Sequence, residues 1–425
     1  MSERLISVEE ALERMLDGIR ALPHESVGVD EAVGRVLAEP LAARVTLPPW
    51  DNSAMDGFAV QSTDVAAAAP DRPVRLRVVG EVAAGHEPSA TVGPGTAMRI
   101  LTGAMLPEGA DTVVPVEETD AAEGVAALPE TVAVLAPAAR GHHVRRAGSD
   151  FHAGAELLAP GLRISPQALA LVVAGGHGAL AVHRRPRVAV LATGDELTAP
   201  GQPLPPGHIH DSNSPGLAAQ ARAYGAEVRR LGVARDTLPA VEAALRAAIA
   251  WADVVVCSGG VSVGARDVVR AAFERVGRVD LWRVAVQPGK PLAFGRAAAE
   301  DGREVLLFGL PGNPVSSFVT FEIFVRPVLR MLAGDRAPTA RSVVRARLAE
   351  AVTKGPGRRA FLRVILGADP DHPGEWIAHL AGAQGSHVLS ALALADGLAV
   401  VAENVDGLAA GAHVEVWQLR PMEGA

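Results

Sequence analysis

Between residues 187 and 332, short apolar runs that favour strands alternate with longer segments patterned as helices. The expected strands are 187–193, 227–233, 253–258, 281–286 and 304–310. The first helix between them is expected to have Ser214 as its N-cap and Pro215 at its first helical position. Strands that alternate with helices produce a doubly wound, mostly parallel sheet, so this stretch predicts a central α/β domain.

The regions on either side of this stretch differ from it in residue composition and in the pattern of apolar residues. Residues 47–146 are rich in Pro, Gly and short β-like runs, which predicts a small β-rich module. Residues 333–425 contain spaced strand candidates and predict a C-terminal β-barrel or sandwich. The first twenty residues have apolar side chains at helical spacing and predict an amphipathic helix. A chain of this length should divide into roughly two to four units, so we expect a multidomain α/β and β protein.

Charge and cysteine content exclude several classes of protein. The formal net charge of −8 argues against nucleic-acid binding, which needs clustered Lys and Arg. The single cysteine, Cys257, excludes an intrachain disulfide and ends an apolar run, so we expect it to be buried. The longest apolar tract, 168–182, is shorter than a membrane span, and the N-terminus lacks the pattern of a secretory signal. We therefore expect a cytoplasmic protein without a membrane segment.

Acidic residues follow the first three expected strands. They are Asp195 with Glu196, then Asp236, then Asp267. The carboxyl ends of parallel strands meet at one edge of a sheet, where folds of this kind bind ligands. Carboxylates beside a phosphate repel it unless a hard cation intervenes, so this pattern favours Mg²⁺. A solvated loop whose acids cap helices is the alternative for each of these residues taken singly.

A loop of glycine and serine follows the third strand, in the segment SGGVSVGARD. Small residues let backbone N–H groups approach an anion closely, and a helix beginning near residue 267 would add its positive end. The loop residues expected to bind substrate are Ser258, Gly259, Gly260, Ser262 and Gly264. We interpret the loop as a cradle for an oxyanion such as a phosphate group.

A turn with similar properties follows the last expected strand, in the segment LPGNPVSS. After Pro311 and Gly312, it has Asn313 as an N-cap and Pro314 at the helix start, with Ser316 in the first helical turn. The N-terminal end of a helix attracts anions. If the strand order places this turn at the same sheet edge, these residues join the candidate substrate site.

A lysine stands on a tight turn in the segment QPGKP. Lysine occurs only at Lys290 and Lys354, in a chain that otherwise uses arginine, so each lysine merits attention. The Lys290 ammonium group would neutralise a phosphate or another oxyanion from this turn. Chance retention of a surface lysine is the alternative.

Several of these segments together resemble a known family. SGGVSVGARD, PGKPLAFG, LPGNPVSSFVTFEIFVRP and TGDEL resemble the molybdenum-cofactor biosynthesis domain. The block PPWDNSAMDGFAV at residues 48–60 resembles the MoeA and gephyrin E-domain family in particular, and residues 99–118 and 144–161 extend that resemblance. The resemblance covers nearly the whole chain, and the combination of the glycine loop with DNSAMDG is specific.

The resemblance implies an activity and an assembly. The implied enzyme is a molybdopterin molybdotransferase, which takes adenylyl-molybdopterin and molybdate and, with Mg²⁺, yields the molybdenum cofactor and AMP. The family fold implies an elongated homodimer, in which the active cleft lies between the α/β domain of one subunit and the β module of the other. The implied divisions are an N-terminal helix at 1–26 packed on the α/β domain, a discontinuous linking domain at 27–46 and 147–185, the β module at 47–146, the α/β domain at 186–332 and the C-terminal barrel at 333–425.

The same resemblance assigns roles to matching residues. The implied catalytic residues are Asp56, Thr102, Asp150, Glu196, Asp236, Asp267 and Lys290, of which Glu196, Asp236 and Asp267 are the implied ligands of Mg²⁺. The residues expected to bind substrate are Ser258, Gly259, Gly260, Ser262, Gly264, Arg283, Pro311, Gly312, Asn313, Pro314 and Ser316. Asp56 and Asp150 rest on the resemblance alone, since without it turn chemistry would explain Asp56.

The chain departs from the family pattern at three positions. Val268 replaces the large residue that commonly follows the loop aspartate, and Gln287 replaces a second lysine before the PGKP turn. Arg283 is the candidate to supply that missing positive charge. His86 replaces an amide side chain in the turn at 83–88. The sequence therefore predicts the type of reaction more firmly than it predicts the affinity for the substrate.

Two other functions compete with the molybdotransferase. One is a molybdopterin adenylyltransferase-like enzyme built on the shared domain, and the four-domain pattern argues against it. The other is a non-catalytic scaffold like the gephyrin E domain, which has no need of the clustered charges of Asp56, Asp236 and Asp267. Transfer of substrate from a separate adenylyltransferase is a further expected partnership. Pairs of histidines lack the companion ligands of a structural zinc site.

Overall fold

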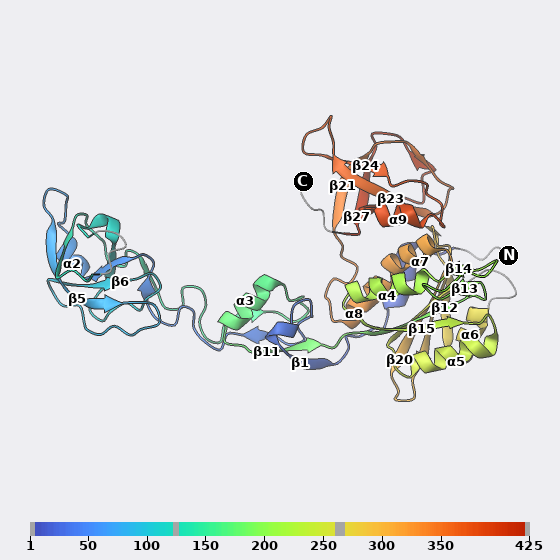
Figure 1. Cartoon of the computed structure of the whole chain (residues 1–425), viewed down its shortest axis with the longest axis horizontal. Helices are drawn as coiled ribbons and strands as arrows, with labels where there is room; N and C mark the ends of the chain where they lie inside the picture. The colour runs from blue at the N-terminus through green and yellow to red at the C-terminus, as the bar shows by residue number, and fades with distance from the viewer. Residues whose placement is uncertain (1–4, 122–126, 260–267, 421–425) are drawn as a thin grey trace.

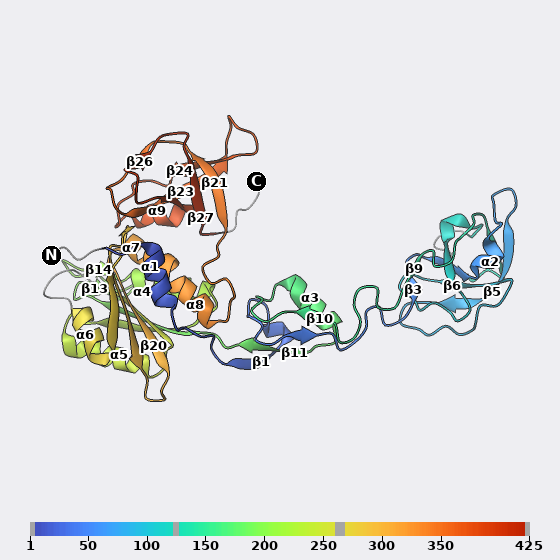
Figure 2. The ribbon, with the colours of Figure 1, turned by 180° about the vertical axis from the view of Figure 1, so that it is seen from behind.

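The structure is a computed structural model that describes residues 5–121, 127–259 and 268–420 (Figure 1). Figures 1 and 2 show an elongated molecule whose two ends differ in architecture. A β module that contains β5 (Val74–Val82) and β6 (Thr96–Ile100) lies at one end. An α/β unit and a C-terminal barrel lie at the other end, and a small unit with α3 (Pro166–Ala174) connects them.

A six-stranded mixed sheet forms the centre of the α/β unit. Its first four strands, in spatial order, pair in parallel, and its last two strands pair antiparallel to their neighbours. The spatial order is β15 (Glu227–Ala234), β12 (Arg187–Thr193), β16 (Val254–Ser258), β20 (Glu304–Leu310), β19 (Pro291–Ala298) and β17 (Arg278–Arg283). The predicted α/β architecture is therefore confirmed, with a parallel half that carries the expected strand ends.

Helices cover both faces of this sheet and bury two apolar cores. One face carries α5 (Leu238–Ile249) and α6 (Val268–Val276), whose Leu245 and Phe273 pack against Val255 of the sheet. The other face carries α1 (Val8–Leu16), α4 (Asn213–Ala223), α7 (Pro314–Thr320), the π-helical turn η3 (Phe321–Val325) and α8 (Arg326–Leu332). Strands buried on both faces read as continuous apolar runs, which explains the sequence VVVC. Cys257 is fully buried, and burial raises its pKa to about 12.

The expected strand at 281–286 was wrong in its boundaries, and one strand was missed. Strand β17 ends at Arg283, and Val286–Gln287 forms the separate strand β18. The missed strand β19 begins with a proline and contains Gly295, two residues that usually punctuate strands. A Cβ atom at Gly295 would lie 2.5 Å from the Arg278 carbonyl oxygen, so this close strand approach requires glycine.

The C-terminal unit is a closed barrel rather than a sandwich. Five strands close on themselves because β23 pairs with both β24 and β25. They are β23 (Arg359–Ala368), β24 (Trp376–Leu380), β21 (Val343–Leu348), β27 (His413–Gln418) and β25 (Gly397–Val401), with β22 (Val352–Thr353), β26 (Gly407–Leu408) and α9 (Leu389–Leu394) alongside. Strand β18 pairs in parallel with β23, so backbone hydrogen bonds join the barrel to the α/β unit.

The β module and the connecting unit are small and have cores of their own. The five-stranded sheet of the module has the order β7 (Thr112–Pro115), β4 (Gly57–Val60), β6, β5 and β8 (Thr131–Val134). The module also contains α2 (Ser62–Val65), η2 (Val116–Glu118) and the paired strands β3 (Asn52–Ser53) and β9 (Val144–Arg145). The connecting unit contains β1 (His24–Gly28) with β11 (Ala179–His183), β2 (Leu41–Ala42) with β10 (Glu156–Leu158), η1 (Val29–Glu31) and α3. Its core joins Val27 and Leu37 to Val172 and Val182, from chain segments on both sides of the module.

The β module and the connecting unit thus have cores of their own, whereas the core of the α/β unit includes helix α1 and extends to Phe361 and Leu398 of the barrel. The residue numbers at which we divide the chain remain those predicted from the sequence. Within the described ranges, the structure has no helix that is both long and apolar enough to cross a membrane.

Candidate active site

The carboxyl ends of the parallel strands meet at one edge of the sheet. The register aligns Ala192 of β12 with Ser258 of β16, and Ser258 with Leu310 of β20. Thr193 is aligned with Ala234 of β15. The segments that follow these strands therefore start side by side, and they include the predicted acids, the glycine loop and the turn at 311–313.

Three carboxylates crowd together at the β12 and β15 end of this edge. The Asp236 backbone N–H donates to Asp195 Oδ1 at 3.3 Å, and a Cβ atom at Gly194 would lie 2.7 Å from Glu196 Oε2. Burial, followed by the negative charges of Asp195 and Glu196, raises the pKa of Asp236 above its ordinary value. Like charges at this spacing disfavour ionisation, and a bound cation would relieve their repulsion.

These residues have the type of donor atom that Mg²⁺ prefers, but their side chains are not arranged around a metal position. Carboxylate oxygens are the donors that Mg²⁺ prefers. In the ranges 5–121, 127–259 and 268–420, however, no group of three His, Cys, Asp or Glu side chains is placed to hold a metal ion. Asp267, the third implied ligand, lies outside the described residues, as do Gly260, Ser262 and Gly264.

The described start of the glycine loop is held in place by the Asn213 side chain of helix α4. Ser258 is buried, and its hydroxyl accepts a hydrogen bond from Asn213 Nδ2 at 2.7 Å. The same Asn213 amide donates to the Gly312 carbonyl oxygen at 2.7 Å, which ties the β16 loop to the β20 loop. Gly259 has a φ of +101°, and a Cβ atom there would lie 2.3 Å from the Thr193 carbonyl oxygen. Only glycine fits that position.

Asn213 is a site residue that the sequence reasoning missed. We expected Ser214 to cap helix α4, but the helix begins at Asn213, and the Asp211 carboxylate accepts the Ser214 backbone N–H at 3.0 Å. Asp211 therefore provides the cap, which leaves the Asn213 side chain to bridge Ser258 and Gly312. The signal in the sequence was the polar run DSNS directly before the helix, which offers several capping residues.

The turn after β20 lies where it was expected. Asn313 is the N-cap residue of α7, although its side chain makes no capping hydrogen bond. Ser316 is buried at 3% exposure, and Ser317 donates to the Pro311 carbonyl oxygen. A Cβ atom at Gly312 would lie 3.6 Å from the Gly259 Cα atom, so the two loops are in close contact.

The Lys290 turn packs against helix α7. Gly289 has a φ of +112°, and a Cβ atom there would lie 2.3 Å from Thr320 Cγ2. Lys290 itself is exposed. In the sheet register Arg283 is the partner of Pro291, so the backbone at Arg283 flanks this turn. Gln287, which replaces a family lysine, lines the same cavity as Lys290.

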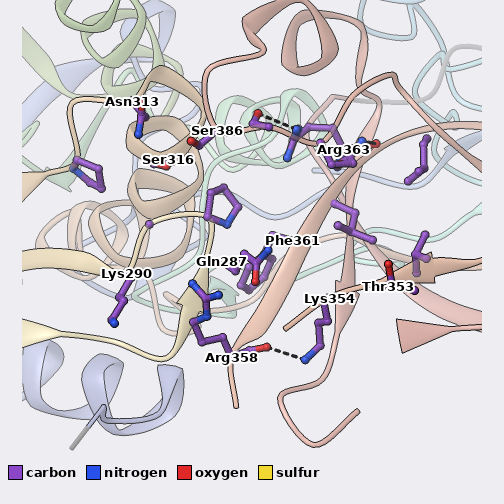
Figure 3. Close-up of a pocket in the computed structure, with 18 of the residues that line it drawn as sticks. Gln287, Lys290, Asn313, Ser316, Thr353, Lys354, Arg358, Phe361, Arg363 and Ser386 are labelled. Atoms are coloured by element: carbon purple, nitrogen blue, oxygen red, sulfur yellow. Dashed lines mark hydrogen bonds between the residues drawn. The ribbon is translucent and has the colours of Figure 1, made fainter. Parts of the chain in front are cut away.

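A cavity of about 610 Å³ opens between this sheet edge and the C-terminal barrel. Figure 3 shows Gln287, Lys290, Asn313 and Ser316 of the α/β unit together with the barrel residues Thr353, Lys354, Arg358 and Arg363, and it shows Ser386 of the barrel beside Ser316. Both lysines of the chain therefore line one cavity. Its lining in the described residues includes four cationic side chains and no carboxylate, which makes the cavity suited to anions.

The barrel side of the cavity holds its cations by backbone groups. Arg363 is 1% exposed and donates through Nη2 to the carbonyl oxygens of Ala383 and Gly385, both at 3.1 Å. Burial lowers the pKa of Arg363 to about 10. Lys354 Nζ donates to the Arg358 carbonyl oxygen at 2.9 Å. The sequence reasoning assigned none of these barrel residues to the site, although the scarcity of lysine was a signal for Lys354.

The residues expected from the β module are not brought to this cavity within one chain. Thr102 donates to Asp56 Oδ1 from its backbone N–H at 2.6 Å and from its hydroxyl at 2.7 Å, and these bonds lower the pKa of Asp56. Asp150 is exposed, and its backbone N–H donates to the Leu47 carbonyl oxygen at 3.1 Å. Figure 1 shows the module at the opposite end of the molecule from the α/β unit.

The other two departures from the family pattern lie on separate elements. Val268 is the first residue of α6, directly after the undescribed segment. His86 is exposed on the module, where its Nδ1 atom lies 3.3 Å from the Ala84 carbonyl oxygen. Neither residue lines the cavity described above.

Three family comparisons match successive parts of the chain. The MoeA N-terminal region (domain I and II) matches residues 6–176, the "Probable molybdopterin binding domain" matches residues 189–331, and the MoeA C-terminal region (domain IV) matches residues 345–419. These matches over most of the chain define a multidomain protein of molybdenum-cofactor biosynthesis.

Relatives and solved structures match over the full length. The molybdopterin molybdenumtransferase 2 of Mycobacterium tuberculosis is 41% identical, over 97% of this chain and 99% of that protein. The molybdopterin molybdenumtransferase of Synechococcus elongatus is 39% identical, over 98% of this chain and 100% of that protein. The crystal structure of a molybdopterin biosynthesis MoeA protein from Pyrococcus horikoshii matches with a TM-score of 0.80 at 33% identity, over 99% of this chain and 100% of that one. This chain belongs to the MoeA family of molybdopterin molybdenumtransferases.

Proposed function

We propose that this protein is a molybdopterin molybdotransferase, which inserts molybdate into adenylyl-molybdopterin and releases AMP. The observation that carries the proposal is the cationic cavity of about 610 Å³, which opens at the same edge of the sheet as the strand-end carboxylates. Full-length relatives with the corresponding name support it.

Both proposed substrates are anions, and the cavity lining accounts for their recognition. Lys290, Lys354, Arg358 and Arg363 offer positive charge to phosphate and molybdate oxygens from two sides. Charges held by buried backbone contacts, as for Arg363, need little reorganisation when an anion enters. Asn213 keeps the two substrate loops at a fixed separation by donating to both.

Mg²⁺ is part of the proposal, and Glu196, Asp236 and Asp267 are the residues that would hold it. When bound, Mg²⁺ would withdraw negative charge from the phosphoanhydride that breaks as AMP leaves. Burial, and then the negative charges of Asp195 and Glu196, raise the pKa of Asp236, and a bound cation would offset both effects. Ser258 then has a positioning role, since its hydroxyl is buried and engaged with Asn213.

We also propose a cytoplasmic homodimer with a shared active site. The predicted catalytic residues Asp56, Thr102 and Asp150 belong to the β module or its connection, and Figure 1 shows the module at the opposite end of the molecule from the α/β unit. A second subunit that brings its module to this cavity would complete the site. A separate adenylyltransferase is the proposed source of the substrate, because adenylyl-molybdopterin is itself an adenylylation product.

The two competing functions are less well supported. An adenylyltransferase-like activity would need only the α/β unit, whereas the cavity takes three of its four cationic side chains from the barrel. A scaffold without catalysis would have no use for three crowded carboxylates at the strand ends.

Incubation with adenylyl-molybdopterin, molybdate and Mg²⁺ tests the proposal, with AMP release as the readout. We expect AMP release that depends on both molybdate and Mg²⁺. Asp267→Asn should bind the adenylylated pterin but release AMP at least tenfold more slowly across a Mg²⁺ titration. Wild-type rates in that variant would refute the metal assignment, and AMP release without molybdate would contradict the proposed reaction.

A further inference from the structure

A second cationic pocket, of about 490 Å³, lies away from the candidate active site. We call it the arginine pocket, and define it by Arg163, Tyr224, Arg326, Arg330 and Arg341. It shares no lining residue with the cavity that contains Lys290. Figure 1 shows helix α8 in this region, between the connecting unit that carries α3 and the chain segment that rises to β21.

The arginine pocket is assembled from three units of the molecule. Arg163 belongs to the connecting unit, directly before α3. Tyr224 ends helix α4 of the α/β unit, and Arg326 and Arg330 lie on α8. Arg341 lies in the segment that leads into the barrel. A ligand in this pocket would contact all three units at once.

The pocket carries more positive charge than its acidic neighbours neutralise. Asp335 accepts a hydrogen bond from Arg330 Nε at 2.8 Å, and its Oδ2 atom lies 3.5 Å from Arg163 Nη2. Glu322, the other acidic neighbour, is 4% exposed. Its Oε1 accepts from the Tyr224 hydroxyl at 2.7 Å, and its Oε2 lies 4.0 Å from Arg326 Nε. Four guanidinium groups therefore face two carboxylates, which leaves a surplus of two positive charges.

Two of these guanidinium groups, Arg326 and Arg341, are desolvated, and Arg326 lacks a full set of hydrogen-bond partners. Arg326 is 8% exposed, and its Nη2 donates to the Ala340 carbonyl oxygen at 2.7 Å. Its Nη1 atom is buried and has no hydrogen-bond partner among the described residues. Burial lowers the pKa of Arg326, and burial together with the charge of Arg326 lowers the pKa of Arg341 to about 10. A buried N–H without a partner costs free energy that a bound anion would recover.

Aromatic rings hold the same guanidinium groups in place. Arg341 Cζ lies 3.6 Å from the centre of the Trp417 ring, and Arg326 Cζ lies 5.3 Å from the centre of the Tyr224 ring. Stacked guanidinium groups keep their N–H donors pointing sideways in a fixed fork, the geometry that matches phosphate oxygens. The pocket is therefore ordered before any ligand binds.

We propose that the arginine pocket binds a phosphate dianion, either inorganic phosphate or the terminal phosphate of a small metabolite. The surplus of two positive charges matches the charge of such a group. The size is that of a small-molecule site, and the net charge of −8 on the chain disfavours a polyanion as the ligand. Because three units line the pocket, bound phosphate would join them and raise the melting temperature.

The test must separate this pocket from the candidate active site, which is also cationic. The full chain with Lys290→Met and Arg358→Met provides a background in which anion binding at the other cavity is weakened. In that background we expect calorimetric titration with inorganic phosphate to show one saturable site, and melting to shift upward against chloride at equal ionic strength. Trp417 fluorescence should change over the same concentration range, because Arg341 stacks on that ring.

Three variants in this background decide the assignment. Arg341→Met and Arg163→Met should each weaken phosphate binding at least tenfold. Arg222→Met, an exposed arginine of α4 outside the pocket, should leave it unchanged. If Arg341→Met fails to fold, the exposed Arg163 decides the result. No saturable binding, or equal weakening by all three substitutions, would overturn the proposal.

A further titration identifies the source of the phosphate group. AMP carries a terminal phosphate on a nucleoside, so saturable AMP binding in the same background, lost in Arg341→Met, would indicate a phosphorylated metabolite. Binding of phosphate without AMP would indicate the free ion. Neither the phosphate result nor the AMP result depends on the proposed molybdotransferase activity. The background substitutions Lys290→Met and Arg358→Met remove two cations from the candidate active site, and no turnover is measured.

Discussion

Thr102 donates two hydrogen bonds to a single oxygen of Asp56, from its backbone N–H at 2.6 Å and from its hydroxyl at 2.7 Å. The arrangement fixes the Asp56 carboxylate on the exposed surface of the β module, and both bonds lower its pKa. Both bonds go to one carboxylate oxygen, Oδ1. A carboxylate held so firmly at an exposed turn supports its proposed role at a site completed by a second subunit.

Substitution of Thr102 tests that role. Thr102→Ala keeps the backbone N–H but removes the hydroxyl, so the pKa of Asp56 should rise part of the way to its ordinary value. A depressed carboxylate pKa contributes stability above the unfolded pKa that is lost as pH falls through the folded pKa, so this variant should lose part of that contribution. NMR titration of Asp56 measures the shift, and turnover should fall by about tenfold, on a scale of about 1.4 kcal/mol per decade. Thr102→Ser should restore both, and an unchanged pKa in Thr102→Ala would contradict the prediction.

Mixing two inactive variants tests the shared site. Asp56→Ala and Asp267→Ala homodimers should each lack activity, because each cleft has lost one essential carboxylate. After subunit exchange, a mixed dimer has one cleft with both residues intact, so activity should return. AMP release measures the recovery, and dimers that cannot exchange because they are cross-linked serve as the control. A fully active monomer, or no recovery despite demonstrated exchange, would refute the assembly.

Exchange of Lys290 for arginine tests the need for a compact cation. The lysine is exposed on a turn packed against α7, so Lys290→Arg should leave the melting temperature unchanged. The broad guanidinium should misplace its charge at the phosphate or molybdate oxygens, and turnover should fall at least tenfold, equivalent to about 1.4 kcal/mol. Arg222→Lys is the matched control, an exposed cation exchanged in the opposite direction. Equal turnover in wild type and Lys290→Arg would leave the lysine as an ordinary surface residue.

Removal of one carboxylate at the sheet edge tests the proposed cation site. The folded pKa of Asp236 is raised, so its ionisation destabilises the fold as pH rises from the unfolded pKa through the folded one. Asp195→Asn removes part of the cause and should gain stability relative to wild type over that pH window in Mg²⁺-free buffer. Melting curves against pH measure the difference, with the exposed Asp71→Asn as control. Addition of Mg²⁺ should stabilise wild type more than Asp195→Asn, and equal gains would argue against a cation at this edge.

Much of the α/β unit could be predicted from the sequence because its strands are buried on both faces. The runs at 187–193 and 304–310 coincide with β12 and β20, since only continuous apolar side chains fit between two helical layers. Parallel pairing then places Asp195, Asp236 and Gly259 at one edge whatever the details of the loops. Strand β19 was not predicted because Pro291 and Gly295 are residues typical of turns. Only the structure shows that strand β17 passes so close to Gly295 that a side chain would not fit there.

The sequence by itself determined the family, the order of the units and the acids and loops of the α/β edge, because these depend on residues close together in the chain. Tertiary structure alone decided the rest of the cavity. Backbone pairing of β18 with β23 brings Lys354 and Arg363 opposite Lys290, across more than sixty residues of chain. The arginine pocket arises in the same way, where three units meet around α8. Contacts between distant segments depend on how whole units pack, and local sequence patterns carry no signal of that packing.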